Sequence, residues 1–243
     1  MGALKMHARV HLERAPINAP AIVLVHGLGV SSRYMMPTAE RLSTHARVYA
    51  PDLPGFGLSD KPRRTLSIRE LADALSAWMT ANNLKRVVLL GNSLGSQIIV
   101  DFAVRYPERV ERAVLVALPV DRQARGLLRQ FARLLLDASR EPLSLLPIVI
   151  SDYLRAGIAR GIRTALYALA DRIEEKLPLM RALTLVVRGE RDPIVPQRWA
   201  EDATALLPRA RLVVIPSVAH AVNYSAPDEL AREVLRFMEE ERS

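Results

Sequence analysis

One stretch decides the fold: Arg86-Val-Val-Leu-Leu-Gly-Asn-Ser-Leu-Gly-Ser-Gln-Ile-Ile-Val100. The apolar run from Val87 to Leu90 predicts a buried strand, and the apolar spacing after Gly95 predicts a helix that reaches about Tyr106. Strand, Gly-x-Ser-x-Gly and helix in this order indicate a turn so sharp that Ser93 adopts strained backbone geometry, with its hydroxyl lifted clear of the sheet. Ser93 is therefore the candidate nucleophile.

Outward from this stretch, short apolar runs alternate with segments of helical spacing. Ser67 and Glu70 form a capping-box pattern that marks the start of one such helix, and residues 5–13 alternate loosely, as an edge strand does. Strands alternating with helices predict an α/β fold with a mostly parallel, doubly wound sheet. The remaining predicted strands are Ala21–Val25, Arg47–Ala50, Ala113–Leu118, Leu183–Arg188 and Arg211–Ile215.

The alternation stops between Pro119 and about Met180, where only helical spacing is found. A helical insertion on the site side of a sheet is typical of a cap or lid. We therefore expect a core made of residues 1–118 and 183–243 and a helical cap made of residues 119–182. The cap carries eleven basic and seven acidic residues, which indicates a solvated outer face or, alternatively, a preference for anionic substrates.

Three loops that follow strands carry groups with catalytic potential. The loop His26-Gly-Leu-Gly29 can turn the backbone N–H of Leu28 inward, and we expect His26 to brace this loop rather than to act as a base. Asp192 follows one predicted strand and His220 follows the last one. Open α/β sheets build their sites at the carboxyl ends of the strands, so these groups are predicted to meet at the edge that carries Ser93.

Serine, aspartate and histidine in this chain order suit acyl transfer. His220 is the candidate base that takes the proton of Ser93, and Asp192 is the candidate that orients and stabilises the imidazole. The backbone N–H groups of Leu28 and Leu94 are the candidate oxyanion hole.

Composition narrows the class of protein. The chain has 243 residues and no cysteine, which excludes disulfides and thiolate metal sites and favours a cytoplasmic location. No apolar stretch approaches the roughly 20 residues needed to cross a bilayer, so stable membrane insertion is not expected. The formal charge is +8, but the basic residues are interleaved with acids, and we do not expect nucleic-acid binding.

The chain resembles the α/β-hydrolase superfamily over essentially its whole length outside the predicted cap. Five motifs carry the resemblance: His26–Gly29, Asp52–Asp60, Gly91–Gly95, Gly189–Val195 and Ala219-His220. It implies a helical cap over an acyl pocket, no cofactor and no metal, and a small-molecule substrate. The predicted function is that of a serine hydrolase that cleaves carboxylic esters, a carboxylesterase-like activity with an acyl-enzyme intermediate.

Departures from neighbouring families leave several alternatives. Haloalkane dehalogenases and epoxide hydrolases carry aspartate where this chain has Ser93. Carbon–carbon hydrolases of the meta-cleavage type share the Gly-Asn-Ser-x-Gly motif, but Leu28-Gly29-Val30 and Ala221 differ from their usual oxyanion loop and from the aromatic after their histidine. Cofactor-free acyl transfer or perhydrolysis would use the same triad, and a non-catalytic receptor role is a further alternative.

An alternative acid and a set of pocket residues complete the candidate site. Asp121 occupies the acid position that some members of the superfamily use, although Asp192 is preferred. Four apolar or aromatic residues are proposed to line the substrate pocket, namely Met35, Phe131, Tyr153 and Tyr167. Acyl-chain length, physiological substrate and oligomeric state stay open.

Overall fold

The computed structural model describes residues 4–121 and 125–240. A single seven-stranded sheet runs through it in the order β1-β3-β2-β4-β5-β6-β7. Every neighbouring pair is parallel except β1 with β3, which is antiparallel and places β1 at the edge. The strands are β1 (Ala8–His11), β2 (Ala21–Val25), β3 (Arg47–Pro51), β4 (Val87–Asn92), β5 (Val110–Val116), β6 (Leu183–Gly189) and β7 (Ala210–Ile215).

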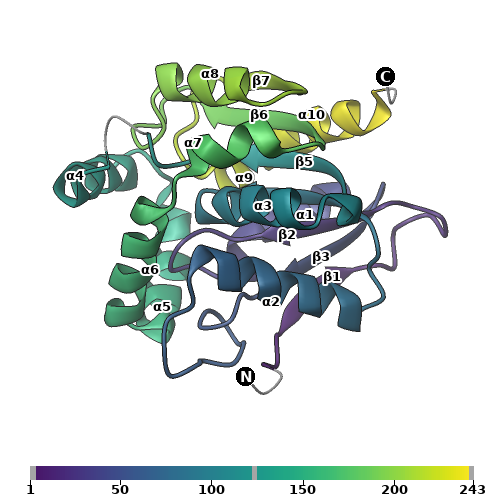
Figure 1. Cartoon of the computed structure of the whole chain (residues 1–243), viewed down its shortest axis with the longest axis horizontal. Coiled ribbons are helices and arrows are strands. Elements are labelled where there is room, and N and C mark those ends of the chain that lie inside the picture. The colour runs from purple at the N-terminus through teal and green to yellow at the C-terminus, as the bar shows by residue number, and fades with distance from the viewer. Residues whose placement is uncertain (1–3, 122–124, 241–243) are drawn as a thin grey trace.

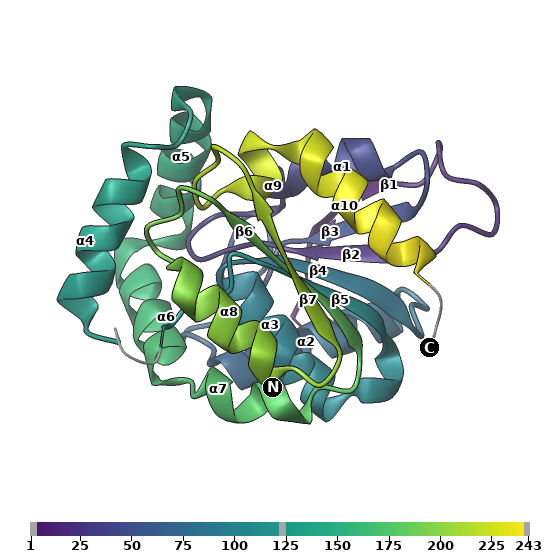
Figure 2. The ribbon, with the colours of Figure 1, turned by 90° about the horizontal axis from the view of Figure 1, so that it is seen from above.

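Helices cover both faces of the sheet, as the alternating pattern predicts. Figure 2 shows α1, α9 and α10 on one face and α2, α3, α7 and α8 on the other. β2 and β4 lie in the middle and are buried at every residue, which explains why they are continuously apolar. The bounds are α1 (Met36–Leu42), α2 (Ile68–Ala81), α3 (Leu94–Arg105), α7 (Ile173–Lys176), α8 (Gln197–Leu206), α9 (Val222–Ser225) and α10 (Pro227–Glu239).

The predicted start of α2 is confirmed. The Ser67 side chain accepts the backbone N–H of Glu70, and the Glu70 carboxylate accepts the backbone N–H of Ser67. This reciprocal pair satisfies two donors that a helix start leaves without partners.

The helical segment between β2 and β3 has two parts. A 3₁₀ helix (Ser32–Met35) leads into α1, which begins at Met36 and has Pro37 in its first turn. Proline lacks an N–H and clashes with the preceding turn, so it is tolerated only at a helix start. Pro37 therefore fixes where the α-helical part begins.

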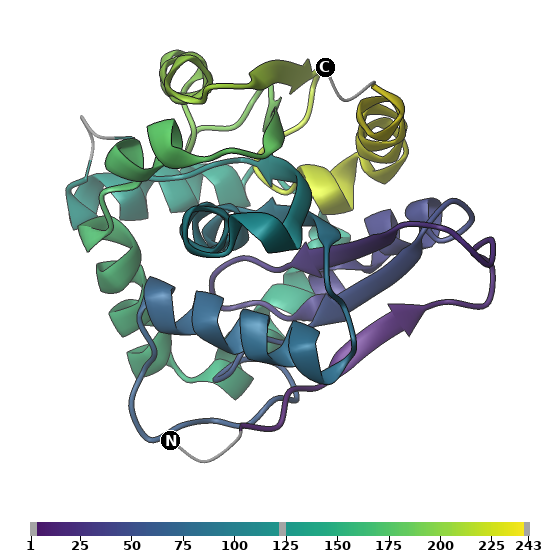
Figure 3. The same ribbon diagram turned by 45° about the vertical axis from the view of Figure 1, so that its right-hand side comes forward.

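Between β5 and β6 the described residues contain helices and no strand. α4 (Leu127–Ala138), α5 (Leu146–Ala156) and α6 (Ile158–Ala170) stand together beyond one end of the sheet, at the left of Figures 1 and 2. Figure 3 shows the loop between β1 and β2 on the far side of the molecule from them. α7 differs because it packs against α3 beside the sheet. We refer to α4, α5 and α6 with their connecting residues as the cap helices.

Candidate active site

Ser93 has the strained geometry that the motif predicts. It is the residue before α3 and has φ 54° and ψ −120°, in a region that residues with a Cβ rarely adopt. Such strain costs about 1–3 kcal/mol and persists only where the surroundings enforce it. A Cβ at Gly91 would overlap the backbone of Gly95, and a Cβ at Gly95 would overlap the carbonyl oxygen of Val25, so both glycines are needed for the turn.

His220 and Asp192 are brought together. The Nδ1 atom of His220 lies 2.8 Å from Oδ2 of Asp192, and both side chains are buried. The other oxygen of Asp192 accepts the backbone N–H groups of Ile194 and Val195 at 2.8 and 3.0 Å. With one oxygen fixed by the backbone, the carboxylate holds the imidazole so that its Nε2 atom is the one left for chemistry.

Asp121 is engaged elsewhere. Its two carboxylate oxygens accept from Nη2 of Arg198 at 3.0 and 3.1 Å, and Arg133 lies 3.8 Å away. A carboxylate paired with arginines in this way is not oriented for histidine. The geometry thus favours Asp192 over Asp121 as the acid.

The candidate oxyanion donors face the same space as Ser93. Leu28, Ser93, Leu94 and His220 all line one cavity of about 650 Å³. Within the described part of the chain, neither the N–H of Leu28 nor that of Leu94 donates a hydrogen bond to the protein. Two uncommitted N–H groups beside a serine hydroxyl suit an oxygen that gains negative charge.

His26 braces the loop that carries Leu28, as predicted. Its Nδ1 atom donates to the carbonyl oxygen of Gly27 at 2.9 Å, and its Nε2 atom accepts the N–H of Leu53 at 2.9 Å. Burial lowers the pKa of His26, so the neutral ring that these two bonds require is also the favoured form.

Asn92 is a residue whose role the motif did not reveal. Its side-chain N–H donates to the carbonyl oxygen of His220 at 3.2 Å, and its side-chain oxygen accepts the hydroxyl of Tyr34 at 3.1 Å. Asn92 therefore joins the serine turn to the histidine loop. The only signal in the sequence is its place inside the Gly-x-Ser-x-Gly motif.

Two cap carboxylates also reach the histidine loop, a contact that no sequence motif indicates. Asp137, in α4, accepts the backbone N–H of His220 at 3.2 Å. Glu141 accepts the backbone N–H of Ala221 at 2.6 Å and the hydroxyl of Ser225 at 2.8 Å. Both residues line the cavity, so the cap helices and their connecting residues contribute to the surroundings of the histidine.

These carboxylates shift the titration of the site. Burial by itself lowers the pKa of His220, but the charge of Asp192 and its hydrogen bond, helped by Asp137 and Glu141, raise it to about 9. Burial raises the pKa of Asp137 to about 6, with Glu141 and Asp192 adding to the effect and His220 opposing it. At neutral pH the site therefore favours an imidazolium flanked by carboxylates.

Two of the four proposed pocket residues line the cavity and two do not. Phe131 and Tyr153 face it. Met35 is fully buried in the core, where its sulfur accepts from the side chain of Asn223. Tyr167 lies on the outer side of α6 because Gly161, Ala165 and Ala168 occupy the inner side.

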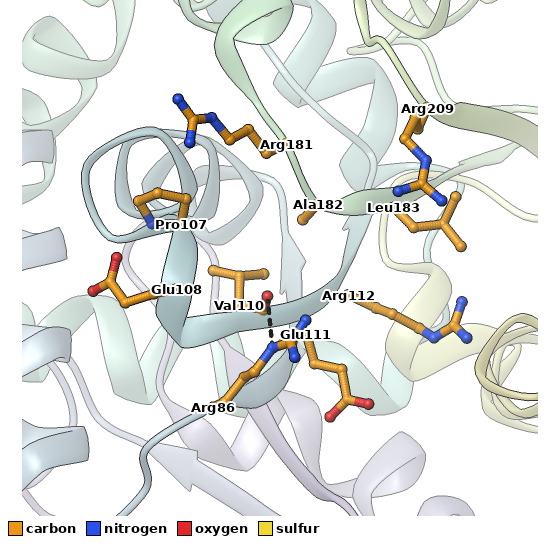
Figure 4. A pocket seen from close by; sticks show the side chains of 10 residues that line it. All are labelled: Arg86, Pro107, Glu108, Val110, Glu111, Arg112, Arg181, Ala182, Leu183 and Arg209. Atoms are coloured by element: carbon orange, nitrogen blue, oxygen red, sulfur yellow. Dashed lines mark hydrogen bonds between the residues drawn. The ribbon is translucent and has the colours of Figure 1, made fainter. Parts of the chain in front are cut away.

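A second cavity, of about 500 Å³, lies at the opposite edge of the sheet, where β4, β5 and β6 begin. Figure 4 shows that its arginines do not converge: Arg181 points away from Arg112, while Arg86 donates to the carbonyl oxygen of Val110. None of the predicted site residues lines it.

The chain matches the model of the alpha/beta hydrolase family over residues 22–233, and it belongs to that family. A putative carbamate hydrolase, RutD, of Agrobacterium fabrum is 29% identical and covers 96% of this chain and 98% of its own length. The enol-lactonase of Burkholderia xenovorans LB400 has a TM-score of 0.81 at 23% identity, with 98% of both chains covered. A meta-cleavage product hydrolase of Pseudomonas fluorescens IP01 has a TM-score of 0.72 at 25% identity, with 97% and 94% covered.

Family membership makes this chain a hydrolase by class. In the described residues, no helix combines the length and the apolarity that crossing a membrane requires. Residues 4–121 and 125–240 also contain no group of three or more histidine or carboxylate side chains placed to hold a metal ion.

Proposed function

We propose that the protein is a serine hydrolase that cleaves carboxylic esters through an acyl-enzyme, with Ser93, His220 and Asp192 as its triad. The observation that carries the proposal is the meeting of four features at one cavity. These are the strained serine, the histidine paired with a buried aspartate, and the two uncommitted N–H groups of Leu28 and Leu94.

The proposed reaction has two halves. Ser93 Oγ attacks the ester carbonyl while Nε2 of His220 takes its proton, and the N–H groups of Leu28 and Leu94 stabilise the oxyanion. The imidazolium then protonates the leaving alcohol, and the acyl group stays on Ser93. In the second half His220 takes a proton from water, the hydroxide adds to the acyl carbon, and collapse returns the proton to Ser93 and frees the carboxylic acid.

The cavity favours esters with an apolar acyl group. Its walls beyond the triad are formed by apolar side chains of the cap helices, including Leu134, Leu146, Val149 and Ile162. Of the predicted cap of residues 119–182, we accordingly propose that the cap helices form the acyl-binding side of the site, whereas α7 packs against α3 beside the sheet. The lack of cysteine supports a cytoplasmic location for this activity.

Carbon–carbon bond cleavage of the meta-cleavage type is the second candidate. It is favoured by the structural likeness to a meta-cleavage product hydrolase and by the shared Gly-Asn-Ser-x-Gly motif. The apolar cap side of the cavity favours the ester hypothesis, because the dienoate substrates of that reaction carry a carboxylate. Acyl transfer would use the same acyl-enzyme with another acceptor in place of water.

The test is a series of p-nitrophenyl esters from acetate to long acyl chains, with a meta-cleavage dienoate assayed in parallel. We expect hydrolysis of the esters, with an optimum at medium or long chains because the cavity is apolar and large. Turnover of the dienoate without ester hydrolysis would transfer the assignment to carbon–carbon cleavage. Folded protein with neither activity would refute both hypotheses.

A pH profile tests the part played by Asp137. His220 must be neutral to take the proton of Ser93, so kcat/KM should rise with pH and reach its midpoint near the raised pKa of about 9. In Asp137→Asn the negative charge that stabilises the imidazolium is gone, and the midpoint should move to lower pH. Asp228→Asn, an exposed change of the same kind on α10, should leave it in place. A midpoint that stays put or rises in Asp137→Asn contradicts the expected role.

A further inference from the structure

All carboxylates of the cap helices turn towards the core. Between residues 127 and 170 the sequence has three, Asp137, Glu141 and Asp152. Asp137 and Glu141 accept from the histidine loop. Asp152 is buried and accepts the hydroxyl of Ser31 at 2.6 Å, with Arg33 at 3.5 Å. Within the described residues, the exposed surface of the cap helices therefore carries arginines and apolar residues but no carboxylate.

The mouth of the cavity is apolar and open. A side chain that both lines the cavity and is exposed must lie where the cavity meets solvent. Leu128 and Leu143, each 85% exposed, and Phe131 at 57% meet both conditions. So do Leu134, Leu146 and Ile162. Apolar surface thus continues from beside Ser93 to the outside of the cap.

Exposed apolar side chains continue from the mouth along α5 and α6. Along α5 the exposed side chains recur at helical spacing, with Leu146, Ile150 and Leu154 on one stripe; on α6 they are Ile158, Ile162 and Leu166. Exposed apolar side chains that gather on two helices in contact with each other are typical of a surface that meets another apolar surface.

Two exposed arginines lie on the same helices as these stripes. Arg155 follows Leu154 on α5, and Arg163 follows Ile162 on α6; both are exposed. Neither makes an ion pair or side-chain hydrogen bond with any residue in the described ranges. Exposed arginines without partners, together with exposed apolar side chains, fit a ligand that has negative charge at its surface and an apolar interior.

We propose that the cap helices dock on an anionic lipid surface, with the cavity mouth facing the lipid. This inference rests on the proposed function for its substrate class, which becomes an acyl ester supplied from the lipid layer. We call the proposed contact the docking face. It consists of Leu154, Arg155, Arg163 and Leu166 together with the six apolar residues at the mouth of the cavity, namely Leu128, Phe131, Leu134, Leu143, Leu146 and Ile162. The arginines would meet the headgroups while the leucines enter the layer beneath.

A second copy of this chain fits the docking face less well. A symmetric dimer across it would bring arginines of the same charge together, and no exposed carboxylate of the cap helices is available to pair with them. It would also cover the entrance to the cavity. A lipid layer covers the same apolar residues and supplies substrate through that entrance.

Vesicle sedimentation tests the inference by measuring binding alone, without any ester hydrolysis. The Ser93→Ala variant is mixed with vesicles of phosphatidylcholine alone or with about one third phosphatidylglycerol. We expect binding to the anionic vesicles, much weaker binding to the neutral ones, and loss of the difference at high salt, where charges are screened. Such binding supports docking whether or not the wild-type protein hydrolyses esters.

Variants locate the contact. Replacing both Arg155 and Arg163 by glutamine should weaken anionic-vesicle binding about 25-fold, since each arginine near such a surface contributes about fivefold. Replacing Leu154 and Leu166 by serine should weaken it about tenfold. The control for the arginine variant is the double replacement Arg181→Gln with Arg232→Gln. The control for the leucine variant is Ile17→Ser. Ile17 belongs to the loop between β1 and β2, and this loop lies at the opposite end of the molecule from the cap helices (Figures 1 and 3).

Thermal unfolding of each variant shows that it is folded. Equal vesicle binding by wild type and both docking-face variants, or no binding by any of them, would overturn the inference. A dimer in solution that the leucine variant dissociates would also overturn it, because the face would then belong to a second copy.

Discussion

Ser93→Ala is expected to lower kcat for ester hydrolysis by about 10⁶-fold, because loss of a triad nucleophile leaves only the residual effect of binding and the oxyanion hole. The reason lies in the position of the hydroxyl: the turn at φ 54° presents it to the cavity that Leu28, Leu94 and His220 share. Steady-state hydrolysis of the best p-nitrophenyl ester measures the loss.

The matched control for this variant is Ser139→Ala. Ser139 follows α4, is exposed, and its hydroxyl donates to the carbonyl oxygen of Leu136. It should retain wild-type activity. If Ser93→Ala keeps more than about one tenth of the wild-type rate while remaining folded, the acyl-enzyme mechanism is wrong.

Asp192→Asn is expected to lower kcat by about 10⁴-fold. An amide at this position favours the wrong imidazole tautomer and carries no charge to stabilise the imidazolium. The 2.8 Å contact between Nδ1 of His220 and Oδ2 of Asp192 is the one that changes. The variant should change kcat more than KM, because Asp192 stabilises the positive charge that forms on His220 during the reaction.

Asp121→Asn separates the two candidate acids. It removes the same charge at a buried carboxylate that pairs with Arg198 instead of histidine. We expect a loss of stability from the weakened pairing with Arg198 and Arg133 and a kcat within a few fold of wild type. Loss of activity in Asp121→Asn alone would reverse the assignment.

The parts of the site that follow strand ends were predictable from sequence. Apolar runs identify the strands, and parallel strands bring their carboxyl ends to one edge, so Ser93, Asp192 and His220 had to share that edge. Gly91 and Gly95 mark the turn around Ser93 by their spacing alone. These residues were visible because the position of each one depends on the strand next to it in the chain.

The contacts of the cap with the site were not predictable in the same way. Asp137 meets the backbone of His220 across 83 residues of sequence, and nothing local to α4 indicates where that helix docks. Met35 illustrates the converse error, since its apolar character suits a pocket and a core equally, and packing beneath Asn223 placed it in the core.

The orientation of the cap carboxylates also bears on how a reaction in this cavity would end. Ester hydrolysis leaves a newly formed carboxylate that Asp137 and Glu141 repel and that the imidazolium of His220 attracts, while Arg155 and Arg163 are exposed on the cap helices outside the cavity. Inhibition by the acid product should therefore weaken as the pH rises through the pKa of His220, because the carboxylates of the cavity then repel the product without an opposing imidazolium.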